Sequence, residues 1–265
     1  MIELYNLAIR SALEAGRKII EVYNSSDFEI TEKSDQSPLT IADRAAHELI
    51  VSYLEKTNVP ILSEEGKSIP YEERENWSVF WLVDPLDGTK EFIKRNDEFT
   101  VNIALIEEGK PVFGVVYAPA LEDLYVGVVG AGSWLVKKPD SFINIQSIKA
   151  EGVSLKSISQ SKEKTSYRVV ASRSHLNPDT ENYLQQLRTI HKEVEIVSKG
   201  SSLKLCMVAS GKADEYPRLG PTMEWDVGAA HAVVKGAGKS VKIFGTEEEL
   251  NYNKENLLNP YFLVI

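Results

Sequence analysis

Hydrophobic side chains recur at helical spacing near the start of the chain. Over residues 2–23 one stripe holds Tyr5, Ala8, Ile9, Ala12, Leu13, Ile19, Ile20 and Tyr23, which predicts an amphipathic helix. A second stripe, formed by Ile41, Ala45, Leu49, Ile50 and Tyr53, predicts another helix from about Thr40. The intervening PLTIAD places a Pro-Leu turn before a threonine or aspartate start.

The pattern then changes to short apolar runs broken by glycine, proline and charged residues. These runs are VFWLVD, FTVNIALIEE, PVFGVVYAP and LYVGVVG, and we expect them to be strands of one sheet. Residues 137–165 are polar and serine-rich with weak periodicity, which is typical of a connection between lobes. We therefore expect an N-terminal α+β lobe over residues 1–140 and a C-terminal α/β lobe over residues 141–265.

The C-terminal part alternates between the two periodicities. It predicts strands at YRVVAS, EVEIVS and ADEYP, helices at 178–187, from Ser201 and from Glu224, and short strands near Val241 and Phe262. This order indicates a second α/β layer.

Composition narrows the classes of protein. The 265 residues, 43% of them hydrophobic, suffice for a substantial core. With 30 basic and 39 acidic residues the net charge is 30 − 39 = −9, which argues against a general nucleic-acid binder. An anionic ligand must therefore meet locally placed positive charge. No apolar run approaches the length of a membrane span, so we expect a soluble, cytoplasmic protein.

The single cysteine, Cys206, has no partner for an intramolecular disulfide. It lies in the apolar pattern LKLCMVA, which favours a buried structural role over a nucleophile.

Two aspartates stand three positions apart in WLVDPLDGTKEF. Pro85 cannot donate to a strand ladder and Gly88 tolerates a positive φ, so the chain turns sharply after the apolar run. Asp84 and Asp87 would raise each other's proton affinity unless a cation lay between them, and carboxylates suit Mg²⁺. A helix beginning at Thr89 would favour an anion nearby. The alternative is that the two aspartates only shape the turn and cap the helix.

Two further acidic motifs favour the metal interpretation. Ser-Glu-Glu at residues 63–65 follows the apolar run VPIL, and Asp226 follows Trp225 at the head of the last long helix. Acidic groups at the ends of separate apolar elements suggest one convergent site.

Taken together, D-P-L-D-G-T, the distant W-D and the upstream S-E-E resemble the Mg²⁺-dependent, lithium-sensitive phosphatases related to inositol monophosphatase. Within that family, KSDQSPLTIAD, DGTKEFIKRNDEFTVNIAL, SRSH, GSSLK and YPRLGPTMEWD look most like the 3′(2′),5′-bisphosphate nucleotidases. The resemblance covers essentially the whole chain. It implies the five-layer αβαβα sandwich of the inositol monophosphatase and fructose-1,6-bisphosphatase type, with the site between the lobes.

The resemblance also implies a metal centre in the N-terminal lobe that is completed from the C-terminal lobe. One Mg²⁺ would be held by Glu64, Asp84 and the backbone carbonyl of Leu86, and the second by Asp84, Asp87 and Asp226. Li⁺ would inhibit by replacing one of them.

Three more residues are implied in the hydrolysis. Asp35 and Asp43 match acidic positions near a third, weaker metal site and the attacking water. Thr89, hydrogen-bonded to an acid such as Asp43, would orient that water, and Glu64 is a second candidate for this role. The reaction would be in-line attack of a metal-activated water on phosphorus, with no covalent nucleophile.

Substrate choice would come from the C-terminal lobe. Lys204 and Arg218 are candidates to hold a second phosphate, while Ser201 and His175 are weaker candidates for the same anion or the ribose. Gly88, Thr89 and Asp226 would face the reacting phosphate. The structural alternatives are that His175 and Ser201 cap helices and that the two cations are solvated surface charges.

The resemblance therefore implies hydrolysis of the 3′-phosphate of adenosine 3′,5′-bisphosphate to AMP, with a role in sulfur metabolism. The phosphosulfate analogue is a further candidate substrate. The alternatives are an inositol monophosphatase or sugar phosphatase and a non-enzymatic nucleotide sensor. The implied partner is a small bisphosphate nucleotide, and the chain is expected to be a monomer or a homodimer. One departure from the family pattern is Asp97, which stands where a glycine is usual.

Overall fold

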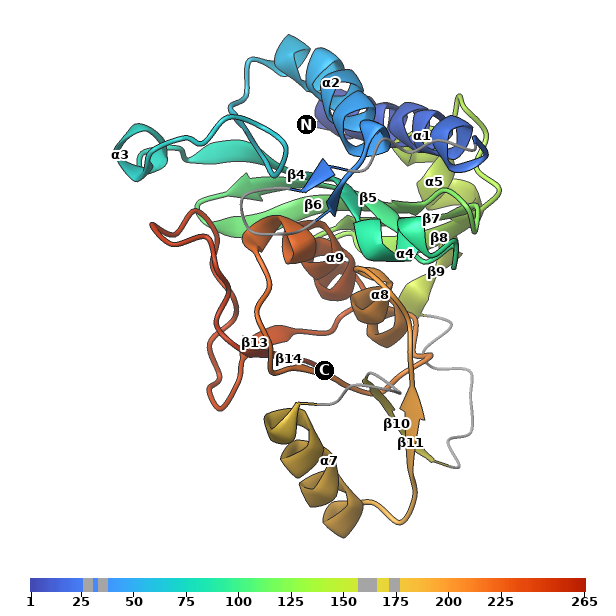
Figure 1. Cartoon of the computed structure of the whole chain (residues 1–265), viewed down its shortest axis with the longest axis vertical. Coiled ribbons are helices and arrows are strands. Elements are labelled where there is room, and N and C mark those ends of the chain that lie inside the picture. Colours follow the sequence, from blue (N-terminus) through green and yellow to red (C-terminus); the bar gives the residue numbers. More distant parts are fainter. Residues whose placement is uncertain (26–30, 33–37, 157–165, 172–176) are drawn as a thin grey trace.

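Helices and sheets alternate along the long axis of the molecule (Figure 1). The computed structural model describes residues 1–25, 31–32, 38–156, 166–171 and 177–265. The layers are helices α1 (Ile2–Tyr23) and α2 (Ile41–Leu54), a seven-stranded sheet, helices α8 (Leu203–Ala209) and α9 (Glu224–Gly236), a layer of short strands, and helix α7 (Pro178–Ile190). The αβαβα sandwich predicted from the sequence is confirmed.

Both predicted helices of the first layer form, and most of the stripe predicted for α1 is buried. The stripe predicted for α2 is wrong except for Ile50, because the buried hydrophobic face of this helix is formed by Ala42, Ala46, Ile50 and Leu54. The buried stripe of α1 lies against the sheet, and the absence of a side chain at Gly16 admits the Tyr117 ring, because a Cβ there would lie 2.3 Å from a ring carbon. α2 begins after Thr40, whose hydroxyl accepts from the amide of Ala42 (3.2 Å) and whose own amide donates to Asp43 (2.8 Å). The start predicted at Thr40 is therefore confirmed, and the cap fixes the Asp43 carboxylate.

The seven-stranded sheet contains the four predicted strands and three that the pattern did not indicate, of which two are short. Its spatial order is β3 (Ile61–Ser63), β4 (Val79–Asp87), β5 (Thr100–Glu107), β6 (Lys110–Ala118), β7 (Asp123–Val128), β8 (Gly132–Lys137) and β9 (Val153–Ser154). Only the β3–β4 pair is parallel. Each face of this sheet carries its own hydrophobic core.

The other short elements connect these layers. They are β1 (Thr31–Glu32), β2 (Pro38–Leu39), η1 (Glu55–Thr57), α3 (Tyr71–Arg74), α4 (Thr89–Ile93) and α5 (Ile145–Glu151). The predicted connection at residues 137–165 contains α5 and β9, and β9 extends the first sheet through the pairs Trp134–Ser154 and Leu135–Val153. The lobe boundary between residues 140 and 141 stays a prediction, while the first sheet continues to Ser154.

The C-terminal strands form two small sheets. β10 (Tyr167–Val170) pairs in parallel with β11 (Val194–Val197), and β14 (Phe262–Val264) lies between β12 (Tyr216–Arg218) and β13 (Val241–Ile243). A bridge between Val169 and Glu215 connects the two sheets. The second α/β layer predicted from the sequence is confirmed.

Helix α9 joins the C-terminal part to the first sheet. A Cβ at Gly114 would lie 2.1 Å from the carbonyl oxygen of Ala229, and one at Gly127 would lie 2.5 Å from the Cα of Val233. These two glycines let the helix backbone rest directly on the strands. The close packing brings the first turn of α9, with Asp226, beside the end of β4. Among the described residues, no helix is long and apolar enough to cross a membrane.

Candidate active site and metal centre

The end of β4 is irregular where the two aspartates lie. The register with β5 shifts between Asp84 and Asp87, and the Leu86 amide donates to Asp84 Oδ1 (3.1 Å). Gly88 follows with a φ of 93°, and Thr89 begins α4. The left-handed glycine turns the chain so that both carboxylates lie at the end of the strand. The turn predicted from D-P-L-D-G-T is therefore confirmed.

Three carboxylates from distant parts of the sequence meet at this turn. Ligand oxygens of Glu64, Asp84 and Asp226 all lie within 4.8 Å of one another. Glu64 is placed by its amide, which donates to the Val83 carbonyl (3.1 Å), and Asp226 accepts from the Met223 amide (2.9 Å) in the first turn of α9. Clustered hard oxygen donors suit a divalent cation such as Mg²⁺.

Asp87 lies beside this group and is held by the turn before α8 and by β5. Its Oδ2 accepts from the Ser201 hydroxyl (2.6 Å), the Ser202 amide (2.6 Å) and, at 3.4 Å, the Asn102 side-chain amide. The alternative that Ser201 caps α8 is wrong, because Ser202 occupies the N-cap position and no side chain caps the helix. Sequence reasoning missed Ser202 and Asn102, although an asparagine inside the apolar run FTVNIALIEE was a usable signal.

The predicted pair of Thr89 and Asp43 comes together from two elements. Thr89 Oγ1 donates to Asp43 Oδ1 (3.2 Å) and also lies 3.4 Å from the Leu86 carbonyl oxygen. Asp43 is 1% exposed, and its second oxygen accepts from the hydroxyl of Thr40 (2.6 Å). The α2 cap therefore holds the carboxylate that contacts Thr89. Asp35 lies outside the described residues.

The proposed cations border the same site. A cavity of about 140 Å³ is lined by Asp87, Glu91, Ser201, Ser202, Lys204, Leu205, Tyr216, Arg218, Thr222, Asp226, Val227 and Phe262. Arg218 Nη2 donates to the Pro221 carbonyl (2.8 Å), while its buried Nε has no hydrogen-bond partner among the described residues. Lys204 Nζ donates to the Ser201 carbonyl (3.2 Å). His175 lies outside the described residues.

The whole chain was compared with known proteins. Residues 1–260 match the inositol monophosphatase family. The chain belongs to this family. It is 44% identical over 257 residues to "3′(2′),5′-bisphosphate nucleotidase CysQ" of Salmonella typhimurium, covering 96% of both chains, and 33% identical over 282 residues to the Haemophilus influenzae protein of that name, covering 99% and 92%.

Solved structures agree with this assignment. The crystal structure of CysQ from Bacteroides thetaiotaomicron superposes with a TM-score of 0.90 at 48% identity, covering all (100%) of this chain and 97% of the other. The extragenic suppressor protein suhB from Bartonella henselae gives a TM-score of 0.71 at 27% identity, covering 96% and 92%. The inositol monophosphatase family is metal-dependent, and the carboxylates of Glu64, Asp84 and Asp226 form a group of the kind that holds a metal ion.

The electrostatics of this family member also fit a bound cation. Burial raises the pKa of Asp84 well above its usual value, and the charges of Glu64, Asp87 and Asp226 raise it further. Burial and the Asp87 charge raise the pKa of Asp226 from 3.8 to about 7. Without a cation the site therefore retains protons that free aspartates release at neutral pH.

This shift predicts how the stability of the metal-free protein depends on pH. Because the folded state holds more protons than the unfolded chain between the two pKa values, the free energy of unfolding falls as pH rises from about 4 to about 7. We expect the metal-free Tm to be lower at about pH 8 than at about pH 5, by at least about 4 °C. Saturating Mg²⁺ should raise Tm more at the higher pH.

Calorimetry at both pH values, with and without Mg²⁺, measures this effect. Asp226→Asn, which carries no charge at either pH, should reduce the pH dependence. A metal-free Tm that rose between the two pH values in the wild type, while Asp226→Asn behaved identically, would contradict it.

The departure at Asp97 has a structural explanation. Asp97 has a φ of 66°, a left-handed conformation that explains why glycine is usual at this position of the family. Its Oδ1 accepts from the Tyr23 hydroxyl (2.8 Å), and the Arg95 guanidinium lies 5.3 Å from the centre of the Tyr23 ring. The aspartate thus ties the loop after α4 to the end of α1 and does not face the metal group.

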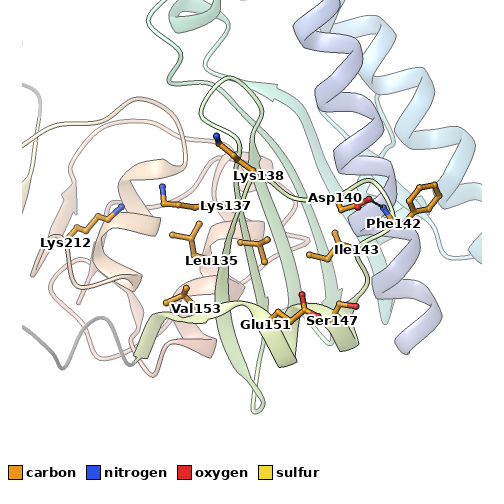
Figure 2. A pocket seen from close by; sticks show the side chains of 11 residues that line it. Leu135, Lys137, Lys138, Asp140, Phe142, Ile143, Ser147, Glu151, Val153 and Lys212 are labelled. Atoms are coloured by element: carbon orange, nitrogen blue, oxygen red, sulfur yellow. Dashed lines mark hydrogen bonds between the residues drawn. The ribbon is translucent and has the colours of Figure 1, made fainter.

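A larger cavity of about 740 Å³ lies at the β8–β9 edge of the sheet (Figure 2). Apolar side chains such as Leu135 and Val153 line it together with lysines 137, 138 and 212. Its carboxylates, Asp140 and Glu151, project from different elements, and neither belongs to the close carboxylate group. The carboxylates that could hold a metal ion lie instead beside the cavity of about 140 Å³, which Asp226 lines.

Proposed function

We propose that the protein is a 3′(2′),5′-bisphosphate nucleotidase that removes the 3′-phosphate of adenosine 3′,5′-bisphosphate and releases AMP. The observation that carries this proposal is one cavity lined both by the carboxylates Asp87 and Asp226 and by the cations Lys204 and Arg218. Acidic ligands suit metal ions at one phosphate, and fixed cations suit a second phosphate. The 44% identity to a relative named for this activity supports the same substrate.

The metal ions proposed are Mg²⁺. Their ligands would be Glu64, Asp84 and the Leu86 carbonyl for one ion, and Asp84, Asp87 and Asp226 for the other. Bound at this place, divalent ions neutralise phosphate oxygens and lower the pKa of a water molecule. The Asp87 carboxylate has only its Oδ1 outside the three hydrogen bonds to Oδ2, so we infer that Oδ1 faces the metal.

Thr89 and Asp43 are proposed to orient the attacking water. When the Thr89 hydroxyl donates to Asp43 Oδ1, a lone pair of Oγ1 is left to accept a hydrogen bond from water. Asp43 is held by the α2 cap, so this hydroxyl has one preferred orientation. The proton of the water has a route toward Asp43 through the threonine.

Lys204 and Arg218 are proposed to bind the phosphate that does not react. Arg218 already uses Nη2 on the Pro221 carbonyl, which fixes the guanidinium beside the cavity, and its buried Nε has no hydrogen-bond partner among the described residues. Lys204 adds a point charge. The phosphosulfate analogue carries a similar anion at this position and is proposed as a second substrate. Inositol monophosphate places no phosphate there.

A substrate panel tests this proposal. Phosphate release is measured from adenosine 3′,5′-bisphosphate, its 5′-phosphosulfate analogue, inositol 1-phosphate and fructose 1,6-bisphosphate, with Mg²⁺, without it, and with added Li⁺. We expect the adenosine compounds to be preferred, Mg²⁺ to be required and Li⁺ to inhibit. Preference for inositol 1-phosphate or fructose 1,6-bisphosphate would assign the chain to another activity, and tight nucleotide binding without phosphate release would indicate a sensor.

A further inference from the structure

A small polar cluster is buried between β5 and the turn that precedes α8. Thr100, Asn102 and Ser202 are 0%, 1% and 2% exposed, and Ser201 lies beside them. Polar side chains this deeply buried are costly unless they hydrogen-bond to one another. The role of these four residues therefore depends on what they contact.

The cluster contacts the metal motif through one atom, Asp87 Oδ2. That oxygen accepts from Ser201, Ser202 and Asn102. Thr100 lies behind these donors, with its hydroxyl oxygen 2.5 Å from Ser201 Oγ and 2.9 Å from Ser202 Oγ. Among the described residues, the Thr100 side chain has no hydrogen bond to a carboxylate. It contacts Ser201 and Ser202, which both donate to the Asp87 carboxylate.

Hydrogen counting gives the direction of these bonds. Each hydroxyl has one hydrogen, and Ser201 uses its own on Asp87. The short contact between Thr100 and Ser201 is then a hydrogen bond only if Thr100 donates to Ser201. The Thr100 hydroxyl also lies 3.2 Å from Asn102 Oδ1, but its one hydrogen is used on the nearer Ser201, and Ser202 donates to Asn102 Oδ1 at 2.9 Å. The 2.9 Å contact between Thr100 and Ser202 then has no hydrogen of its own. The resulting chain runs from Thr100 through Ser201 to Asp87, and each donor strengthens the next.

The turn itself is held from its other side. Glu98 accepts from the Gly200 amide (2.7 Å) and from Lys199 Nζ (2.8 Å), and a Cβ at Gly200 would lie 2.8 Å from the Glu98 carbonyl oxygen. Ser201 has a φ of 54°, a conformation that costs energy in a serine and persists only where the surroundings fix it. The Ser201 carbonyl accepts from Lys204 Nζ, so one turn contacts both a metal-motif carboxylate and a phosphate-binding candidate.

We propose that Thr100 is a positioning residue, which acts through the Ser201 hydroxyl to hold Asp87 with Oδ1 toward the second metal site. The inference rests on the proposed function for the identity of that site. The position of Thr100 suits this role, because Thr100 on β5 pairs with Asp87 on β4 just after the irregularity in their register. Loss of its hydroxyl would leave Ser201 without this donor and weaken the orientation of the Ser201 hydroxyl that donates to Asp87, which should weaken binding of the second ion.

The test compares Thr100→Val, which keeps the shape and removes the hydroxyl, with Thr100→Ser, which keeps the hydroxyl. Mn²⁺ binding to the metal-free full-length chain is followed by electron paramagnetic resonance, independently of turnover. We expect the weaker of two Mn²⁺ dissociation constants to rise about tenfold in Thr100→Val and to stay within about twofold of wild type in Thr100→Ser. The Mg²⁺ concentration for half-maximal activity should rise in parallel, with kcat largely recovered at saturation.

The possible failures are distinguishable. A wild-type protein that bound no second Mn²⁺ would overturn the proposed metal centre. Wild-type binding of two ions with unchanged affinities in a folded Thr100→Val would overturn the positioning role alone, even if Tm fell, because the cluster would then be purely structural. If Thr100→Val does not fold, Ser201→Ala decides in its place: it removes the hydroxyl through which Thr100 reaches Asp87, and unchanged Mn²⁺ affinity in it overturns the proposal.

Discussion

Asp84→Asn is expected to lower kcat/KM by at least about a hundredfold while leaving the chain folded. Asp84 is 1% exposed at the centre of the carboxylate group and is assigned to both proposed ions. Asparagine preserves its size and offers a neutral oxygen in place of a charged one. Steady-state kinetics over a wide Mg²⁺ range measure the loss, and excess Mg²⁺ should restore little of it.

Stability should move in the opposite direction in the metal-free protein. Because burial and three neighbouring charges raise the pKa of Asp84, its ionised form destabilises the empty site at neutral pH. Asp84→Asn should therefore raise the metal-free Tm and reduce the increase that Mg²⁺ produces. The matched control is Asp123→Asn, a substitution of a 9% exposed aspartate that pairs with Lys137 outside the site. Equal losses of activity in the two variants would contradict the metal assignment.

Arg218→Ala is expected to lower kcat/KM for adenosine 3′,5′-bisphosphate by roughly ten- to hundredfold, since charge-assisted hydrogen bonds contribute about 1.5–3 kcal/mol. A chain of net charge −9 cannot attract a bisphosphate at long range, so the non-reacting phosphate depends on local cations. Hydrolysis of a simple monophosphate should change little. Steady-state kinetics of the variant and the wild type measure the loss of kcat/KM on each substrate, and the two losses are then compared.

Two further variants separate the possible roles of this arginine. The charge of Arg218 also lowers the pKa of Asp226, so its loss could act on the metal site instead. Arg218→Lys keeps a charge near Asp226 and loses the planar fork. Its monophosphate turnover should equal that of the wild type, and its bisphosphate turnover should lie between those of Arg218→Ala and the wild type. Arg188→Ala, an exposed position on α7, should leave both activities unchanged. Equal losses on both substrates in Arg218→Ala would make the arginine a support of the metal site.

The local sequence determined much of the architecture. Helical spacing predicted α1 from Ile2 to Tyr23, and the threonine start predicted α2, because these features depend on neighbouring residues only. The Pro-Leu turn predicted before Thr40 was wrong, because Pro38–Leu39 form the strand β2, which pairs with β1. The strands β3 and β9 were missed, since a strand of two or three residues carries too little alternation to be recognised and forms only when a neighbour pairs with it. The six-residue β8 was also missed.

For the site, the sequence by itself supplied the residue types and the motifs: S-E-E, D-P-L-D-G-T and W-D name the acids, and Lys204 and Arg218 name the cations. Tertiary structure alone decided that Glu64, Asp84 and Asp226 meet within 4.8 Å, because α9 must first pack on glycines of the sheet. It alone showed that Ser201 contacts Asp87 and that Thr100 lies behind it. Hydrogen bonds between residues far apart in sequence leave no periodic pattern along the chain, so only the folded arrangement reveals them.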